Sequence, residues 1–117
     1  MTVLIGAVAG SLGAVARYLV SGAIQTRTRS AMPLGTAAVN LVGAFIVGLV
    51  IGVDTTPTGW LLAVSGFAAG FTTFSTWMVE TARLGLFPRP SARAVVNLVV
   101  MTVLGIACIA IGYYVTN

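Results

Sequence analysis

The sequence predicts an all-α integral membrane protein with four transmembrane helices in a single domain that covers residues 1–117. Hydrophobic residues make up 58% of the chain, and only six arginines and two acidic residues carry charge. A soluble domain of this length has many more charges. Four long stretches carry no charge, at residues 1–16, 30–53, 55–79 and 94–117. A helix of about 20 residues crosses the hydrocarbon core of a bilayer, so these stretches indicate membrane spans.

We expect the four spans at about residues 3–24, 32–53, 59–83 and 92–115. The first charge-free stretch continues beyond Arg17 to about residue 24, which gives it the length of a span. It differs from a cleaved signal peptide because it has no basic start and its apolar run is too long.

Short connections are expected between the spans, at residues 25–31, 54–58 and 84–91. Four prolines lie at or beside these turns, as is typical of helix starts and stops: Pro33, Pro57, Pro88 and Pro90. No residues remain for a soluble domain. Because one small chain encloses little of a path through the membrane, we expect an oligomer.

The arginines lie on one side of the predicted arrangement. The first connection and the residues flanking the third hold Arg27, Arg29, Arg83, Arg89 and Arg93, and Arg17 lies in the part of the first span nearest the first connection. The other side holds both termini and the connection with Asp54. The positive-inside rule therefore predicts a multi-pass protein of the cell membrane, with the first and third connections cytoplasmic and both termini outside. Arginines that flank spans do not indicate nucleic-acid binding.

The residue inventory excludes several kinds of chemistry. The chain has no histidine and one cysteine, Cys108, so Cys/His metal clusters, Cys–His nucleophile pairs and intrachain disulfides are excluded. Cys108 is interpreted as a small packing residue. Without a nucleophile–base pair or a metal set, we do not expect an enzyme. A small drug/proton antiporter is disfavoured because it needs a membrane-embedded carboxylate in its first span, and residues 1–24 contain no acid.

The third span contains the polar, glycine-broken run GFAAGFTTFSTW at residues 66–77. Irregular or polar backbone at this depth is tolerated only where protein buries it or where it lines a path. Gly66 and Gly70 weaken a helix, so we expect a break near residues 69–72 whose carbonyls can bind a hard cation such as Na⁺. The alternative is a GxxxG-like packing face with hydroxyls bonded to the preceding turn. For the run as a whole we favour function.

Helical spacing groups the side chains of this run. Thr72, Ser75 and Thr76 share one face, and Phe74 and Trp77 form a neighbouring stripe. Hydroxyls, amides and the edges of aromatic rings all present positive charge to an anion. No arginine stands at the midplane to hold an anion too tightly. The pattern therefore favours an anion path.

Two amides and two charges lie in or near the spans. An amide at bilayer depth must be hydrogen-bonded, so Asn40 and Asn97 are either interhelical hydrogen-bonding residues or donors on a path. The hydrogen-bonding role is slightly favoured for Asn97. Intramembrane ionisable residues indicate function by default. Arg17 could serve an aqueous vestibule for anions or extend to the interface, Glu80 could cap the third span, and the two could also pair.

Three segments of the sequence form a recognisable set: AGSLGAVARY at residues 9–18, PLGTAAVN at 33–40 followed by Gly43, and GFAAGFTTFSTW at 66–77 followed by Glu80. Together they closely resemble the fluoride channel family called Fluc or CrcB. Order, spacing and the four-span layout match over essentially the whole chain. The resemblance implies passive export of fluoride, which lowers its toxicity in the cytoplasm. It also implies antiparallel pairing of two chains, two pores and a structural Na⁺ at the dimer centre.

The resemblance assigns roles to individual residues. It implies that the carbonyls of Ala69 and Thr72 hold the Na⁺ and that Arg17 serves the vestibule. Together with the polar run, it implies a fluoride pore formed by Thr36, Asn40, Thr73, Phe74, Ser75, Thr76, Trp77, Glu80 and Asn97. Three residues depart from the family pattern: Ala69 replaces a glycine, Trp77 replaces a phenylalanine and adds an N–H donor, and Met101 replaces a serine.

The charge bias has a consequence for pairing. An antiparallel homodimer requires each copy to insert either way, whereas here the bias is six arginines to none. Our hypothesis is that the chain takes one orientation and pairs with a paralogous subunit of opposite bias. Trp77 and Met101 would then belong to a specialised half of a heterodimer. The alternative is a non-conducting partner subunit, against which the polar path residues argue.

Overall fold

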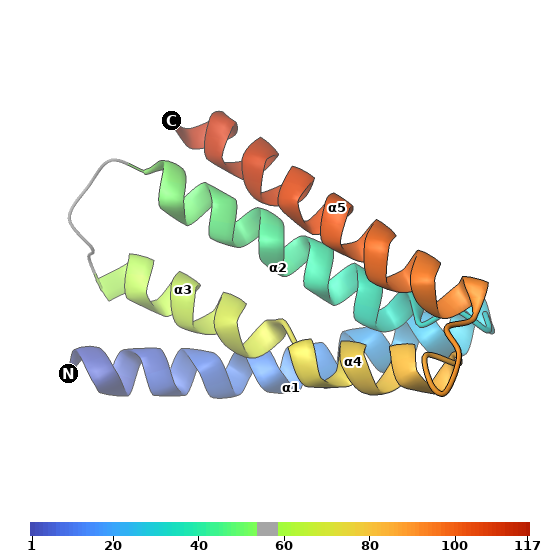
Figure 1. Ribbon diagram of the computed structural model, residues 1–117. Coiled ribbons are helices and arrows are strands. Elements are labelled where there is room, and N and C mark those ends of the chain that lie inside the picture. Colours follow the sequence, from blue (N-terminus) through green and yellow to red (C-terminus); the bar gives the residue numbers. More distant parts are fainter. Residues whose placement is uncertain (54–58) are drawn as a thin grey trace.

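The computed structural model describes residues 1–53 and 59–117. The connection expected at 54–58, with Asp54 and Pro57, lies outside the described residues. The described chain is helical, with elements α1 (Thr2–Thr28), α2 (Leu34–Gly52), α3 (Gly59–Phe71), α4 (Phe74–Arg83) and α5 (Ala92–Thr116). Figure 1 shows α3 running beside α1, and α5 running beside α2. The α4 helix contacts α5 and α2.

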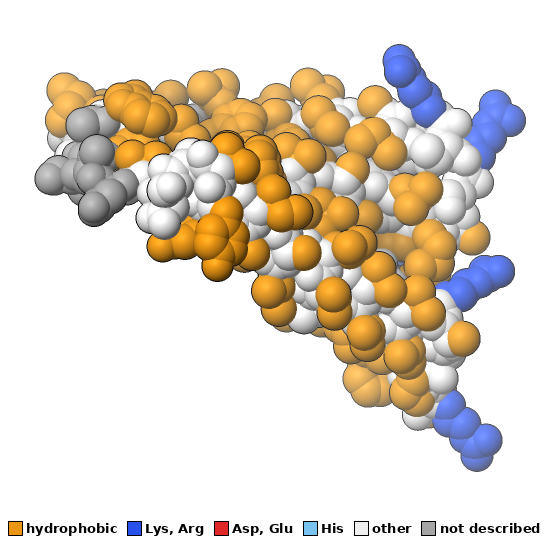
Figure 2. All heavy atoms as spheres, turned by 90° about the horizontal axis from the view of Figure 1, so that it is seen from above, with side chains coloured by type: hydrophobic (Ala, Val, Ile, Leu, Met, Phe, Trp, Pro, Cys, Tyr) orange, Lys and Arg blue, Asp and Glu red, His pale blue; other side chains and the backbone are white. Residues whose placement is uncertain are grey.

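Four segments are long and apolar enough to cross a membrane: Thr2–Thr28, Leu34–Gly52, Gly59–Arg83 and Ala92–Thr116. The third segment contains both α3 and α4. Large apolar side chains cover the outside of the chain, among them Leu12 in α1, Trp60 in α3 and Ile106 in α5, each at least 60% exposed. Figure 2 shows the same apolar cover on one face. Helices that are apolar around their circumference are typical of membrane spans, so the predicted all-helical, four-span protein is confirmed.

The first helix extends further than the sequence predicts, to Thr28. It ends because Arg29 adopts a left-handed conformation with φ 48°, and the Arg29 N–H donates to the carbonyl of Gln25. The Gln25 side chain then holds the following turn, since it donates to two carbonyls there and accepts the N–H of Gly35. The other described helix ends lie close to their predicted positions.

Glycines set the close packing of α1 against α3 and of α2 against α5. A Cβ added to Gly70 would meet the carbonyl oxygen of Gly10, and one added to Gly66 would meet that of Gly6. In the same way, a Cβ on Gly48 would meet the carbonyl oxygen of Ile109 across the α2–α5 contact. Small residues allow helix backbones to approach closely in membranes. The glycines of the polar run therefore serve packing, which was the alternative considered for them.

The arginine-bearing connections lie together at one end of the molecule. In Figure 1 the α1–α2 and α4–α5 connections share the end opposite to both termini. Figure 2 shows the basic side chains of the visible face gathered at that same end. The two ends of the helix bundle therefore differ strongly in charge.

Candidate functional site

The polar groups of the molecule converge on the residues between α3 and α4. Thr72 and Thr73 lie between these helices, and Thr73 has an extended backbone with φ −149° and ψ 117°. The Thr73 hydroxyl accepts the N–H of Thr76 at 3.2 Å and thereby caps α4. The end of a helix leaves its last carbonyls without helical partners. Groups from other helices must satisfy such backbone atoms where water is absent.

Asn40 of α2 satisfies the freed backbone of Thr73. Its Nδ2 donates to the Thr73 carbonyl at 3.0 Å, and its Oδ1 accepts the Thr73 N–H at 2.8 Å. The side-chain amide thus supplies the two backbone hydrogen bonds that Thr73 would have in a continuous helix. An amide nitrogen carries two hydrogens, and the second one of Asn40 has no partner within the described residues.

Arg17 of α1 contacts the residue before Thr73. Its Nη1 donates to the carbonyl oxygen of Thr72 at 3.2 Å. The guanidinium group therefore stands at the carboxyl end of α3, where the helix dipole favours a positive charge. Arg17 forms no ion pair with Glu80 in the described part of the chain, so this predicted option is not observed.

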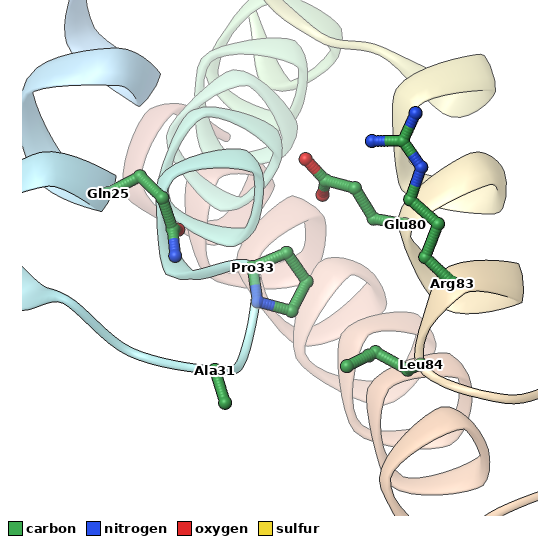
Figure 3. A pocket seen from close by; sticks show the side chains of 6 residues that line it. All are labelled: Gln25, Ala31, Pro33, Glu80, Arg83 and Leu84. Carbon is green, nitrogen blue, oxygen red and sulfur yellow. The ribbon is translucent and has the colours of Figure 1, made fainter.

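Glu80 lies near the arginine-bearing end, and only one of its two carboxylate oxygens has a hydrogen-bond partner. Its Oε1 accepts the hydroxyl of Thr36 at 3.0 Å, whereas its Oε2 is buried without a hydrogen-bond partner. Figure 3 shows Glu80 and Arg83 projecting from α4 beside a cavity of about 300 Å³. The residues that line this cavity are Gln25, Ala31, Pro33, Glu80, Arg83 and Leu84. The arginine that lines this cavity is therefore Arg83, whereas Arg17 contacts the junction between α3 and α4.

Phe74 and Trp77 form the aromatic pair of the site. Their ring centroids are 5.8 Å apart and their planes meet at 78°, an edge-to-face arrangement. Phe74 is 70% exposed on the single chain, whereas the Nε1 atom of Trp77 is buried without a partner. Both rings line a groove of about 260 Å³ together with Asn40, Ala44, Val47, Thr72, Thr73 and Ile109.

The hydroxyl groups predicted for the path divide into buried and exposed ones. Thr36 and Thr73 are buried. Ser75 and Thr76 are exposed on the outside of the chain, as is Ala69. The Thr73 hydroxyl donates to that of Thr76 at 3.1 Å, so these groups form one continuous polar strip from the interior to the surface.

Asn97 is buried and takes part in a chain of hydrogen bonds between α5 and α4. Its Nδ2 donates to the hydroxyl of Thr81 at 2.8 Å, and that hydroxyl donates to the carbonyl of Trp77 at 2.7 Å. Asn97 therefore has the interhelical role that the sequence favoured. Thr81 itself was missed. The sequence did contain a sign of this role, because Thr81 lies in the third span four residues after Trp77. At this spacing a threonine hydroxyl donates to the backbone carbonyl of the preceding helical turn.

The fold and this cluster define a class of small four-span membrane protein whose polar groups gather around the residues between α3 and α4. The comparison with protein families is consistent with this class. The family model described as "CrcB-like protein, Camphor Resistance (CrcB)" matches residues 4–113. The chain belongs to the CrcB family.

Individual relatives agree with the family match. The fluoride-specific ion channel FluC 2 of Mycobacterium tuberculosis is 41% identical over 108 residues, covering 92% of this chain and 85% of the relative. FluC 2 of Mycolicibacterium paratuberculosis is 44% identical over 106 residues, 91% of this chain and 86% of the relative. FluC 1 of Leifsonia xyli is 42% identical over 88 residues, 72% and 64% of the two chains. These matches confirm the resemblance drawn from the three sequence segments.

Proposed function

We propose that this chain is a subunit of a fluoride channel that lets fluoride cross the cell membrane passively and so lowers its concentration in the cytoplasm. Its extensive similarity to proteins named fluoride-specific ion channels carries the proposal. Such a channel is not an enzyme. The chemistry of the site supports the assignment, because the amide of Asn40, the hydroxyl strip and the aromatic pair can all face an anion.

The proposed path begins in the 300 Å³ cavity at the arginine-bearing end. Arg83 and the carboxylate of Glu80 both line this cavity, and the Thr36 hydroxyl donates to one oxygen of Glu80. From there the strip of Thr73, Ser75 and Thr76 leads toward Phe74 and Trp77, with Asn40 beside them. Asn97 contributes by holding α4 through Thr81, and Arg17 contributes by holding the end of α3 through Thr72.

A second chain is needed to complete this path. Ser75, Thr76 and Phe74 are exposed on a single chain, although hydroxyl groups are costly to place in hydrocarbon without partners. A partner chain covering this face would bury the strip and turn it into a pore wall. An antiparallel pair places the same face of both chains together and supplies two such walls.

The carbonyls at the end of α3 fit a structural Na⁺ at the centre of the pair. The Thr73 N–H bonds Asn40, so the Ala69 oxygen is left with a long contact of 3.4 Å from the Thr72 hydroxyl. The Thr72 oxygen accepts from Arg17 and keeps a second lone pair. Two chains would offer four such oxygens, which suit a hard cation. The ion would supply positive charge that joins the two helix ends.

The direct test is fluoride efflux from liposomes that contain this chain alone, measured with a fluoride-selective electrode and with chloride as the control anion. Fast, fluoride-selective release would support a channel formed by this chain. Without release, co-reconstitution with an oppositely biased paralogue distinguishes the two remaining options. Restored flux would identify a heterodimer, and absence of flux would contradict the proposal.

The arginine bias makes a prediction about orientation. We expect a cysteine placed at Asn117 to react with a membrane-impermeant reagent from outside the cell, and one placed at Ala31 to react only from inside, both in a Cys108→Ala background. The reason is that arginine-bearing connections stay cytoplasmic. The numbered names FluC 1 and FluC 2 among the relatives are consistent with a paralogous partner chain. Equal labelling of each position from both sides would show dual insertion and support a homodimer.

Replacing Phe74 by isoleucine should slow fluoride efflux. The substitution keeps apolar bulk but removes a ring edge that can face the anion, and it removes the edge-to-face contact with Trp77. Because Phe74 is 70% exposed on the single chain, the stability of the subunit should change little. We expect a fall of about tenfold in the initial rate, equivalent to about 1.4 kcal/mol. Normal flux in the folded variant would assign Phe74 to packing against the partner.

A further inference from the structure

An apolar groove of about 280 Å³ lies between α2 and α5. Its walls come from residues 32–41, in and just before the start of α2, and from residues 96–104 of α5. Asn97 is the only polar residue among those that line it, and the amide nitrogen of Asn97 donates to Thr81. Leu34, Val96 and Leu104 on the walls are each more than 40% exposed on the single chain. The groove is therefore an apolar surface that this chain does not fill itself.

This groove is separate from the groove that Phe74 and Trp77 line. The two grooves share no lining residue, and no residue of α4 lines the one between α2 and α5. The exposed hydroxyls of Ser75 and Thr76, which need a covering partner chain, lie on α4. A partner that covers this strip therefore does not account for the groove between α2 and α5.

The position and length of the groove match one chain of a lipid. On α5 the lining residues extend from Val96 to Leu104, which is about 12 Å along a helix at about 1.5 Å per residue. One leaflet contributes about 15 Å, half of the hydrocarbon core. The groove begins at the arginine-bearing end of the molecule, close to the starts of α2 and α5. An acyl chain that enters from this end would fill it and make the dispersion contacts that an empty groove lacks.

Arg93 lies at the mouth of the groove. It precedes Val96 and Asn97 by three and four residues, so the three side chains share one face of α5. Helical side chains tilt toward the helix N-terminus, which directs this exposed arginine toward the headgroup layer. Glu80 is the only acidic side chain that the structure describes. Its Oε1 accepts from Thr36 and its Oε2 has no partner, so Arg93 has no acidic side chain as a partner in the described part of the chain.

We propose that the groove between α2 and α5 binds one acyl chain of an anionic phospholipid, and that the phosphate group of this lipid pairs with Arg93. The apolar walls suit the acyl chain, and the unpaired guanidinium at the mouth suits the negative charge of the headgroup. Arginines close to the membrane surface attract anionic lipids. The positive end of the α5 dipole lies at the same place. The inference depends on the membrane-spanning fold and not on the channel function.

The first test compares Arg93→Gln with Arg27→Gln, which removes the same charge at the same end of the molecule. Arg27 lies in the last turn of α1, outside the groove. Native mass spectrometry of the purified chain in detergent measures binding as dioleoylphosphatidylglycerol is added. We expect the apparent Kd of this lipid to rise about fivefold in Arg93→Gln and to stay at the parent value in Arg27→Gln. Equal weakening in both variants would show a general attraction by the arginines and overturn the proposal.

The same titration with dioleoylphosphatidylcholine tests the preference for an anionic headgroup. This lipid has acyl chains of the same kind but no net charge. The parent chain should bind it more weakly than dioleoylphosphatidylglycerol, and Arg93→Gln should reduce the difference. Equal binding of the two lipids by the parent chain would contradict a pairing with Arg93.

The second test fills the groove. Ala37 lines it and is half-buried, so Ala37→Phe should place a ring where the acyl chain lies and raise the apparent Kd of dioleoylphosphatidylglycerol at least about fivefold. Ala23→Phe is the matched control, because Ala23 is exposed on α1 outside the groove. Unchanged lipid binding in folded Ala37→Phe would overturn the proposal. If that variant also eluted as a smaller assembly, the groove would instead be an interface with a second copy of the chain.

Discussion

Replacing Asn40 by aspartate is expected to abolish fluoride efflux. The carboxylate cannot donate to the Thr73 carbonyl, so the hydrogen bond at 3.0 Å becomes a repulsive contact between two oxygens. It also places a fixed negative charge beside the cavity that Asn40 shares with Trp77. Two like charges about 4 Å apart repel by about 4 kcal/mol at an intermediate dielectric. That energy corresponds to a reduction of about a thousandfold.

Asn40→Ala separates the effect of charge from the effect of lost hydrogen bonds. Alanine leaves the N–H and carbonyl of Thr73 unsatisfied, which costs about 1–3 kcal/mol for each group, but it adds no charge. We expect a lower thermal unfolding temperature and reduced, measurable efflux for alanine, and no efflux for aspartate. Initial rates from liposomes with matched protein content measure this. Equal losses in both variants would show that Asn40 acts only through Thr73, and normal efflux in Asn40→Asp would remove Asn40 from the path.

The four spans could be predicted because the bilayer imposes a simple rule. Backbone groups must be satisfied within each helix, so long charge-free stretches must be helical. The end of α1 was predicted too early because a local feature decided it. The left-handed Arg29 and the side chain of Gln25 close the helix at Thr28, and hydropathy carries no information on such a cap.

The sequence identified the polar residues but could not decide their partners. The sequence left two roles open for Asn40 because its partner, Thr73, lies 33 residues away. Thr73 also binds Asn40 through backbone atoms, which leave no side-chain signature in the sequence. The same holds for Arg17, whose acceptor is the carbonyl of Thr72. The additional donor of Trp77 was visible in the sequence. That this donor is buried without an acceptor is a property of the packed helices.

Replacing Gly70 by alanine is expected to prevent the chain from folding correctly. A Cβ at this position would meet the carbonyl oxygen of Gly10, a backbone atom that can move only if α1 and α3 separate. Overpacking costs about 1–3 kcal/mol where side chains can adjust, and more where they cannot. Separation would also pull Arg17 away from the Thr72 carbonyl, and so disturb the junction between α3 and α4.

Gly22→Ala is the matched control, because a Cβ on Gly22 of α1 would meet nothing within 4 Å. Inside a helix, alanine is more favourable than glycine by about 1 kcal/mol, so this variant should be as stable as the parent or more stable. The same chemical change is thus expected to have opposite signs at two positions. Thermal unfolding in detergent and elution by size measure both. An equally stable Gly70→Ala protein would show that α1 and α3 are not held at the close distance on which the path depends.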